Sequence, residues 1–267
     1  MSVVRSGIVR VRYEVLGYVR STDSMVFNFL FPIIMLMLFA TIFHDSNFGS
    51  DADGNKVSAA TYYVTAMLAS GLILTGIQST AIDIANERTG GTLKRWGATP
   101  LSPVSYFLGK LGQVFVAGLI QSVLVIGVGA LLFGVKLPDS WERWGVLAWV
   151  WVLGLAACTL LGIALSTLPR TRRSATGVVV PPLLILQFIS GVYIQFSVLP
   201  DWMQNVASIF PLKWMAQGMR YVFLPENFSA LEQGGNWNLG GVAIALGIWL
   251  LGGLVLARVT FRWNQRN

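Results

Sequence analysis

Five charged side chains occur in the stretch from Asn86 to Lys110, which lies between two long apolar segments. The same stretch holds a Gly-Gly pair and two prolines. Carboxylate, guanidinium and ammonium groups make charge-assisted hydrogen bonds that are stronger than neutral ones. A polar interruption of this kind is suited to contact with the surface of a soluble partner.

The end of this stretch, Leu108-Gly109-Lys110, is similar to the last residues of a phosphate-binding P-loop. A P-loop requires a glycine five positions before Gly109 and a hydroxyl residue directly after the lysine. Val104 and Leu111 occupy those two positions, and no other segment supplies the motif. We therefore expect that this chain has no ATPase site of its own.

The residues that usually bind metals or perform covalent chemistry are scarce. The chain has one cysteine, Cys158, and one histidine, His44. A single cysteine excludes an internal disulfide and a Cys-based metal cluster. We expect no metal site, no bound cofactor and no catalytic constellation, which counts against a membrane-embedded enzyme.

Composition indicates which class of protein must position these groups. The 267 residues are 54% hydrophobic and 12% charged, and the mean hydropathy is +0.64. Soluble domains carry about 25% charged residues. The sequence is therefore typical of an all-α membrane protein.

Apolar runs long enough to cross a bilayer, about 20 residues each, occur six times in the sequence. The predicted transmembrane helices are Met25–Phe43, Ala59–Ala85, Leu111–Val135, Trp144–Leu168, Ser174–Val198 and Leu239–Phe261. The first run is not a signal peptide, because it is too long and no small-residue cleavage site follows it.

The basic residues predict the orientation of these helices. With both termini cytoplasmic, most Lys and Arg lie on the cytoplasmic side, as the positive-inside rule requires. They are Arg5, Arg10, Arg12, Arg20, Arg88, Lys94, Arg95, Lys110, Arg170, Arg172, Arg173, Arg258, Arg262 and Arg266. The net charge of +7 thus reflects topology and does not indicate nucleic-acid binding.

Residues 1–22 are predicted to form an amphipathic helix rather than a further span. Val4, Ile8, Val11, Val15 and Val19 follow steps of three and four, which places them on one helical face. A basic amphipathic helix lies in the membrane interface. It could serve as a lipid anchor alone or also as a platform for a soluble partner, and the pattern is the same for both.

Local signals divide the polar loop, residues 86–103, into a short helix between two hinges. Gly90-Gly91 is a flexible break, and Thr92 to Ala98 can form a helix. Ser102 suits the N-cap and Pro103 the first position of the next helix. The alternative is a solvated loop whose basic residues only set the topology.

Two motifs in this sequence resemble the ABC-2 permease family, the membrane subunits of bacterial ABC exporters that include the daunorubicin-resistance type. The first comprises Glu87, Thr89–Leu93, Ala98–Ser102 and Leu108–Lys110. The second is the stretch SGVYIQFSVLPDWMQNVASIFPLKWMAQGMR from Ser190 to Arg220, in which Gln195 replaces a frequent proline of the family. The resemblance covers essentially the whole chain, as a single transmembrane domain over residues 1–267.

The resemblance implies that the short helix is a coupling helix that seats on a separate ATP-binding subunit. Two such subunits, which bind ATP and magnesium, would join a dimer of permeases made of two copies of this chain or of this chain and a homologue. The expected coupling residues are Glu87, Arg88, Thr92, Lys94, Arg95, Pro100 and Ser102.

The aromatic-rich segment 199–225 is too interrupted by prolines to span the membrane. Aromatic side chains gather at membrane interfaces, so two short re-entrant helices in the outer leaflet are expected. They could form an outer gate or only an aromatic belt. The candidate gate residues are Pro200, Trp202, Phe210, Pro211 and Trp214.

Polar residues inside spans are costly and face protein or water. The candidates for the transport pathway or the dimer interface are Asn28, Gln78, Gln121, Gln187, Ser190 and Tyr193, and Gln113 and Asp83 are further polar residues. Small residues allow close helix approach, and those of span two suggest that this span packs at a subunit interface. No span carries the paired carboxylates of a proton relay, which counts against an ATP-independent secondary transporter.

These observations together predict a six-span permease subunit in the plasma (inner) membrane of a bacterium, in contact with membrane lipid. It would export a hydrophobic or amphipathic compound, a drug or a lipid, with ATP hydrolysed by the partner. The alternative substrate is a lipid-linked glycan.

Overall fold

The computed structural model describes residues 3–46, 48–49, 56–99 and 102–260. Its regular elements in these ranges are all helical. Five helical segments are long and apolar enough to cross a membrane. They are α2 (Thr22–Ile42), the continuous run α3 (Ala59–Ile73), η1 (Leu74–Ser79) and α4 (Thr80–Thr89), α6 (Pro103–Phe133), α7 (Trp141–Leu165) and α11 (Leu239–Thr260).

These five segments coincide with the predicted spans one, two, three, four and six, with one marked difference in length. α6 begins at Pro103 rather than at Leu111, so Lys110 lies inside a helix and not in the preceding loop. The helix starts early because Ser102 caps it and Pro103 follows at its first position.

The predicted fifth span is helical only in part. α8 (Arg172–Ile189) begins with a capping box between Thr171 and Ser174 and ends at Ile189, and a turn and the short 3-10 helix η2 (Phe196–Val198) follow it. Its 18 residues rise about 27 Å, and its first turn is charged. Thus α8 is not among the helices that meet the length and composition of a span, and the sixth crossing stays a prediction.

The run α3–η1–α4 is the buried centre of the protomer. It packs against α2, α6, α7 and α10 (Pro211–Phe223). A Cβ atom added at Gly76 would lie 2.5 Å from Cβ of Cys158 in α7. A Cβ atom added at Gly162 would lie 2.6 Å from the Gly76 carbonyl oxygen. The small residues of span two thus admit neighbouring helices of the same chain, and its place at a subunit interface stays a prediction.

The π-helix η1 widens this central run. The Ser79 hydroxyl donates to the Leu74 carbonyl at 3.0 Å and accepts a hydrogen bond from Nδ2 of Asn28 in α2 at 2.6 Å. π-Helical turns of this kind often occur at functional sites. Here the turn joins the centre of the protomer to α2.

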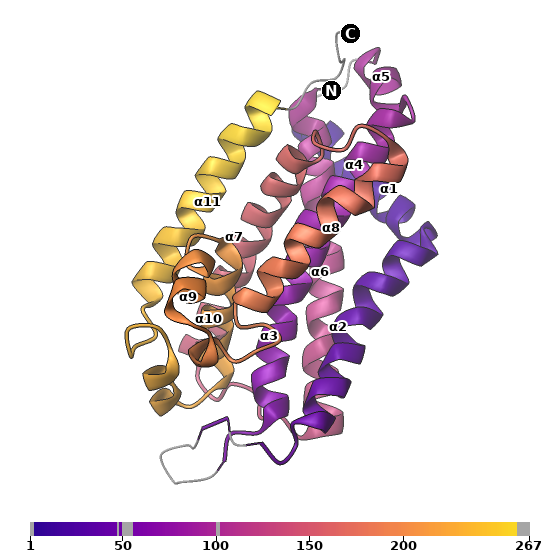
Figure 1. Cartoon of the computed structure of the whole chain (residues 1–267). Coiled ribbons are helices and arrows are strands. Elements are labelled where there is room, and N and C mark those ends of the chain that lie inside the picture. Colours follow the sequence, from indigo (N-terminus) through magenta and orange to yellow (C-terminus); the bar gives the residue numbers. More distant parts are fainter. Residues whose placement is uncertain (1–2, 47, 50–55, 100–101, 261–267) are drawn as a thin grey trace.

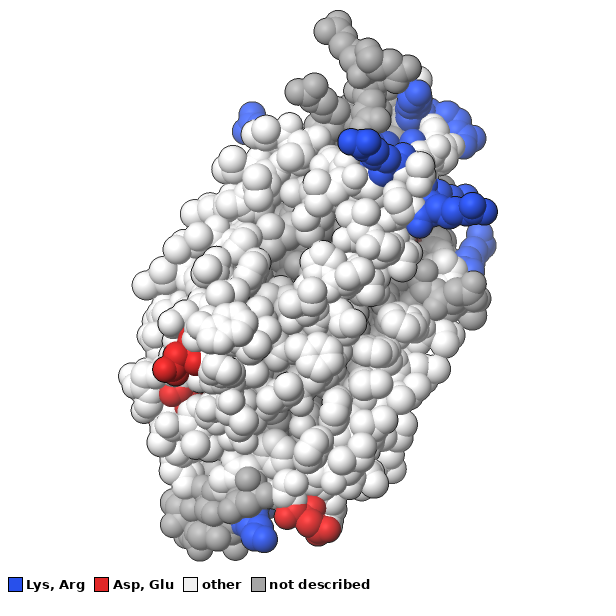
Figure 2. Space-filling view, in the orientation of Figure 1, with Lys and Arg blue, Asp and Glu red and all other residues white. Residues whose placement is uncertain are grey.

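The described chain ends, at Val3 and Thr260, lie at the same end of the molecule as α5 (Thr92–Gly97) (Figure 1). Lys and Arg side chains gather at this end in Figure 2. Exposed cations there include Lys94, Arg95, Arg170, Arg172 and Arg173. We call it the basic end, and its position agrees with the charge distribution on which the orientation prediction rests.

Candidate functional site

The short helix expected in the polar loop is present as α5, at the tip of the basic end. Gly91 precedes it with φ of +76°, a left-handed conformation that favours glycine. Leu93 is buried in one cluster with Ile84, Tyr106 and Ile163. This contact fixes one face of α5 against α4, α6 and α7. Lys94 and Arg95 are exposed.

The second hinge leads into α6 as the sequence predicts. The Ser102 side chain accepts a hydrogen bond from the Ser105 amide at 3.1 Å, so Ser102 is the N-cap and Pro103 starts the helix. Pro100 lies outside the described residues. Thr92, the first residue of α5, is half-buried.

Glu87, at the end of α4, is bound within the protomer. Its carboxylate accepts a hydrogen bond from the Tyr106 hydroxyl at 2.6 Å and one from Nζ of Lys110 at 2.8 Å, and its side chain is 20% exposed. Because both carboxylate oxygens have internal partners, Glu87 is placed to position the loop rather than to reach out from it.

Lys110 extends this contact to the N-terminal helix α1 (Val3–Arg20). Its ammonium also donates to Glu14 at 2.8 Å, and Glu14 pairs with Arg10 at 2.5 Å. The Lys110 side chain is 3% exposed. We call Arg10, Glu14, Glu87 and Lys110 the charged cluster; it joins α1, α4 and α6 by ion pairs shielded from water, where charges interact more strongly than at the surface.

The charged cluster also contacts α5. The Arg10 guanidinium lies 3.7 Å from the centre of the Trp96 ring, within the range of a cation–π interaction. Trp96 in turn lies 5.7 Å from Tyr106, measured between ring centres. The N-terminal helix is thus connected to the exposed helix of the loop through the ring of Trp96.

Sequence reasoning did not identify which residues of α1 face the protein. Tyr18 is buried and Arg10 and Glu14 are half-buried, whereas Ile8 is 67% exposed and Val19 53%. α1 packs closely on α6, where a side chain at Gly109 would lie 2.4 Å from Cγ of Arg10. Of the predicted apolar face, Ile8 and Val19 are therefore free for lipid, whereas Val11 and Val15 are half-buried. The spacing of Arg10 and Glu14, one turn apart, was the signal for an ion pair.

Arg88 and the polar span residues bind inside the protomer as well. Nη2 of Arg88 donates to the Pro169 carbonyl at 2.5 Å. Oε1 of Gln187 accepts hydrogen bonds from Ser70 at 2.5 Å and Tyr193 at 2.8 Å. Asn28 donates a hydrogen bond to the Tyr18 hydroxyl, and Gln121 donates one to the Met67 carbonyl. Gln78 and Ser190 are buried.

The aromatic segment forms the two short helices expected from its prolines, α9 (Asp201–Ala207) and α10. Pro200 precedes α9 and Pro211 opens α10. Trp214 donates to the Ser208 carbonyl at 2.8 Å, and Phe210 stacks on Trp249. Trp202 is exposed. A gating role for these residues stays a prediction.

A buried ion pair on α10 was missed by sequence reasoning. Arg220 donates to both carboxylate oxygens of Glu232, with 2.9 Å between Nη2 and Oε2. Nearby, Lys213 donates to Gln217 at 2.6 Å, and Gln217 donates to the Trp237 carbonyl at 2.7 Å. These contacts fasten the segment after α10 to the protein, and no spacing rule relates Arg220 to Glu232.

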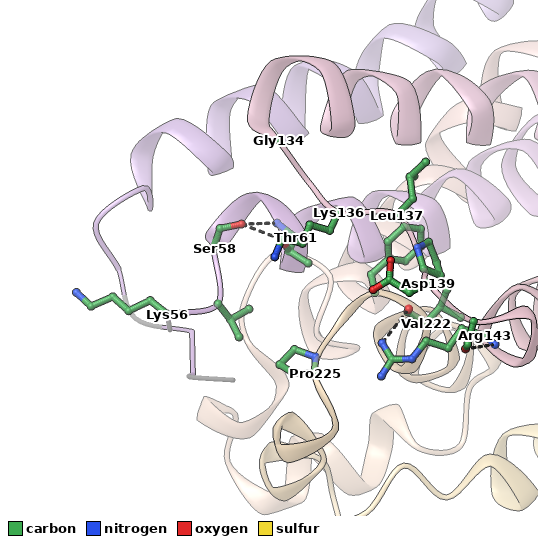
Figure 3. Close-up of a pocket in the computed structure, with 14 residues that line it drawn as sticks. Lys56, Ser58, Thr61, Gly134, Lys136, Leu137, Asp139, Arg143, Val222 and Pro225 are labelled. Atoms are coloured by element: carbon green, nitrogen blue, oxygen red, sulfur yellow. Dashed lines mark hydrogen bonds between the residues drawn. The ribbon is translucent and has the colours of Figure 1, made fainter. Parts of the chain in front are cut away.

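The end opposite the basic end contains a cavity of about 630 Å³ between the start of α3, the α6–α7 connection and the end of α10 (Figure 3). Arg143 points into this region, and its Nη1 donates to the carbonyls of Val222 at 3.3 Å and Leu224 at 3.0 Å. The guanidinium thus satisfies carbonyls at the C-terminal end of α10.

Comparison with known proteins agrees with this architecture. Residues 45–259 match the family described as ABC-2 family transporter protein. The chain belongs to the ABC-2 family. It is therefore a transport permease and a multi-pass membrane protein.

Individual relatives are similar at low identity. A putative transport permease, ycf38, of Pyropia yezoensis is 27% identical, over 80% of this chain and 72% of the relative. The probable multidrug ABC transporter permease YbhR of Escherichia coli is 24% identical, over 55% of this chain and 39% of the relative. The inner membrane transport permease YadH of Escherichia coli is 22% identical, over 73% of this chain and 75% of the relative.

Family membership gives the basic end a role to test. ABC-2 permeases work with ATP-binding subunits, and α5 is the exposed short helix of the loop that connects the second and third spans of this chain. The charged cluster lies directly behind it.

Proposed function

We propose that this chain is the membrane subunit of an ATP-driven exporter, and that α5 receives the movement of an ATP-binding subunit. The observation that carries the proposal is the link between the exposed helix and the buried charges: Arg10 on Trp96 at 3.7 Å, and the ion pairs from Arg10 through Glu14 to Lys110. A displacement of α5 is then passed to α1, α4 and α6 together.

The exposed groups suit such a contact. Lys94 and Arg95 stand on the free side of α5, where no described residue neutralises them. Because cations on a protruding helix attract acidic surfaces and raise association rates, we propose that the ATP-binding subunit presents carboxylates there.

The remaining parts of the proposal concern assembly and cargo. Two ATP-binding subunits would act on two permeases, the second being a copy or a homologue, in a bacterial inner membrane. The cargo would be a hydrophobic or amphipathic compound, a drug or a lipid, because the described spans are predominantly apolar. The name of the relative YbhR, a probable multidrug permease, is consistent with that class.

The test is reconstitution of this chain with its cognate ATP-binding subunit in lipid vesicles. We expect no ATP hydrolysis from the chain alone and export-linked hydrolysis from the complex. In the variant Lys94→Glu/Arg95→Glu, the charge reversal should weaken capture of the ATP-binding subunit while the fold is retained, because both side chains are exposed.

Lys136→Glu is the matched control, since Lys136 is exposed at the opposite end of the molecule. Hydrolysis by the purified chain alone would contradict the proposal. So would full export by the double reversal with the partner still bound.

A further inference from the structure

A second polar cavity, of about 520 Å³, lies at the basic end beside the charged cluster. Residues from α1, α4 and α6 line it, among them Tyr18, Asp83, Asn86 and Gln113. Its volume falls within the range of about 300–1,000 Å³ that is typical of small-molecule sites. Because it opens at the end that carries α5, a molecule can reach it from the same side as the ATP-binding subunit.

The charges around this cavity are unevenly paired. Lys110 is bound by both Glu14 and Glu87. Asp83 also lines the cavity but has no ion pair or side-chain hydrogen bond with any described residue. The other cation at the cavity, Arg172, is exposed at the start of α8. The inner wall therefore carries a carboxylate without a cation of its own.

One amide adds hydrogen-bonding capacity that the protein does not use. Gln113 lines the cavity and is only 4% exposed, and its side chain makes no hydrogen bond with any described residue. A polar group held away from bulk water without a protein partner is costly, so its presence in the wall of a cavity points to a ligand that satisfies it.

We infer that this cavity binds the primary ammonium group of an amphipathic amine before export. An ammonium has three N–H donors, and two residues that line the cavity, Asp83 and Gln113, supply carboxylate and amide oxygens as acceptors. No group of three or more His, Cys, Asp or Glu side chains among the described residues could hold a metal ion, so an organic cation fits better than a metal. The inference rests on the proposed export function and names the class of its cargo.

The test is a binding measurement on the full chain in lipid nanodiscs without the ATP-binding subunit. The probe is dansylcadaverine, a fluorescent amphiphile with one primary amine, and its N-acetyl derivative is the neutral comparison. We expect the amine to bind saturably and the acetylated probe to bind at least about tenfold more weakly. Asp83→Asn and Gln113→Leu should each weaken binding of the amine, with about a tenfold loss for Asp83→Asn.

Asp139→Asn is the matched control, because Asp139 is an exposed carboxylate at the opposite end. Size-exclusion profiles and the capture of the ATP-binding subunit show whether each variant is folded. Asp83→Asn is nearly isosteric, so it can test the charge even if Gln113→Leu fails to fold.

Nanodiscs with and without phosphatidylethanolamine distinguish two sources of the amine. Competition by this lipid would identify a lipid headgroup, and its absence would favour a free amine; each is compatible with the inference. Equal binding of the acetylated probe, or unchanged binding in Asp83→Asn, would overturn it.

Displacement of the amine by the ATP-binding subunit in the absence of ATP would also overturn the inference, because the cavity would then receive a basic side chain of that partner. Since the measurement uses the chain alone, its failure leaves the coupling proposal intact. Conversely, loss of coupling in the reconstituted complex leaves the binding result unaffected.

Discussion

Lys110 of α6 donates a hydrogen bond to Glu87 of α4 at 2.8 Å and binds Glu14 of α1 with the same distance. One buried ammonium thus holds together the N-terminal helix, the end of the central run and the start of the third span. The Glu87 contact closes the base of the loop that carries α5. The rigidity of this loop therefore depends on two ion pairs that share Lys110 and join three separate segments of the sequence.

Removal of Lys110 should destabilise the protein strongly. Lys110→Met leaves two carboxylates without their shared cation, and breaking a buried ion pair costs roughly 3–5 kcal/mol. Glu87→Gln should cost less, because the amide oxygen can still accept the Tyr106 hydrogen bond. The combined variant should be more stable than the sum of the single changes predicts, since it removes both partners of one contact.

The measurement is thermal unfolding of the purified chain in detergent, carried through the full double-mutant cycle. Lys136→Met controls for loss of a lysine at an exposed position. Strict additivity of the two changes would show that the Lys110–Glu87 contact carries no free energy of its own.

Trp96 should stabilise the packing of α5 against α1 and α6. Trp96→Ala removes the ring on which Arg10 lies, so backbone amides in α5 should exchange with solvent faster while α6 keeps its protection. Export-linked ATP hydrolysis should fall with it. Hydrogen-exchange mass spectrometry measures the first effect. Trp141→Ala, at a site that is 91% exposed, should change neither quantity.

Much of this fold follows from patterns that the sequence displays locally. Apolar runs located the five described spans, and Ser102-Pro103 predicted the start of α6. Such predictions succeed because span length and helix capping depend on neighbouring residues. The shortened α8 was not foreseen, although the sequence carries a stop signal: Gly191, directly after the C-cap Ser190, has φ of +79°, the left-handed conformation in which glycine commonly ends a helix.

The candidate site was predicted less completely than the fold. The loop, its hinges and the exposed Lys94 and Arg95 were recognised from the sequence, but the internal partners of Glu87 were not. Glu14 and Lys110 are far apart in the sequence, and only the packing of α1 on α6 brings them together. Pairing between distant segments has no periodic signature, so it became visible only in three dimensions.

Cysteine labelling should test the orientation. In a Cys158→Ser background, Glu226→Cys should react with an impermeant thiol reagent applied outside the cell, and Thr89→Cys should not. Both positions are exposed in the protomer, at opposite ends of the membrane-spanning helices. Permeabilised cells provide the control, because both cysteines should then react. The reverse pattern in intact cells would contradict the predicted orientation.

Lys213 should make stability depend on pH in the alkaline range. Burial lowers the pKa of this ammonium to about 8 from its ordinary value of 10.5, because the charged form loses water. Between these two values the unfolded chain binds more protons than the folded one, so stability rises with pH across that window. Thermal unfolding of the wild type from pH 8 to pH 10 should show a rise that Lys213→Met lacks. Parallel curves for the two proteins would show that Lys213 titrates normally.

The close approach of α7 to the central run should not tolerate an added methyl group. A Cβ at position 162 would lie 2.6 Å from the Gly76 carbonyl oxygen and 2.9 Å from that of Ile77, and both are backbone atoms that cannot rotate away. Gly162→Ala should therefore force the helices apart and lower the stability by roughly 1–3 kcal/mol, the usual cost of overpacking.

Gly127→Ala in α6 is the matched control, because nothing lies within 4 Å of its added Cβ. At that site alanine should be neutral or should stabilise the helix by about 0.5–1 kcal/mol through its higher helix propensity. Thermal unfolding of the two variants side by side separates the steric effect from the propensity effect. Equal stability of both would mean that α7 and the central run are not in the close contact described here.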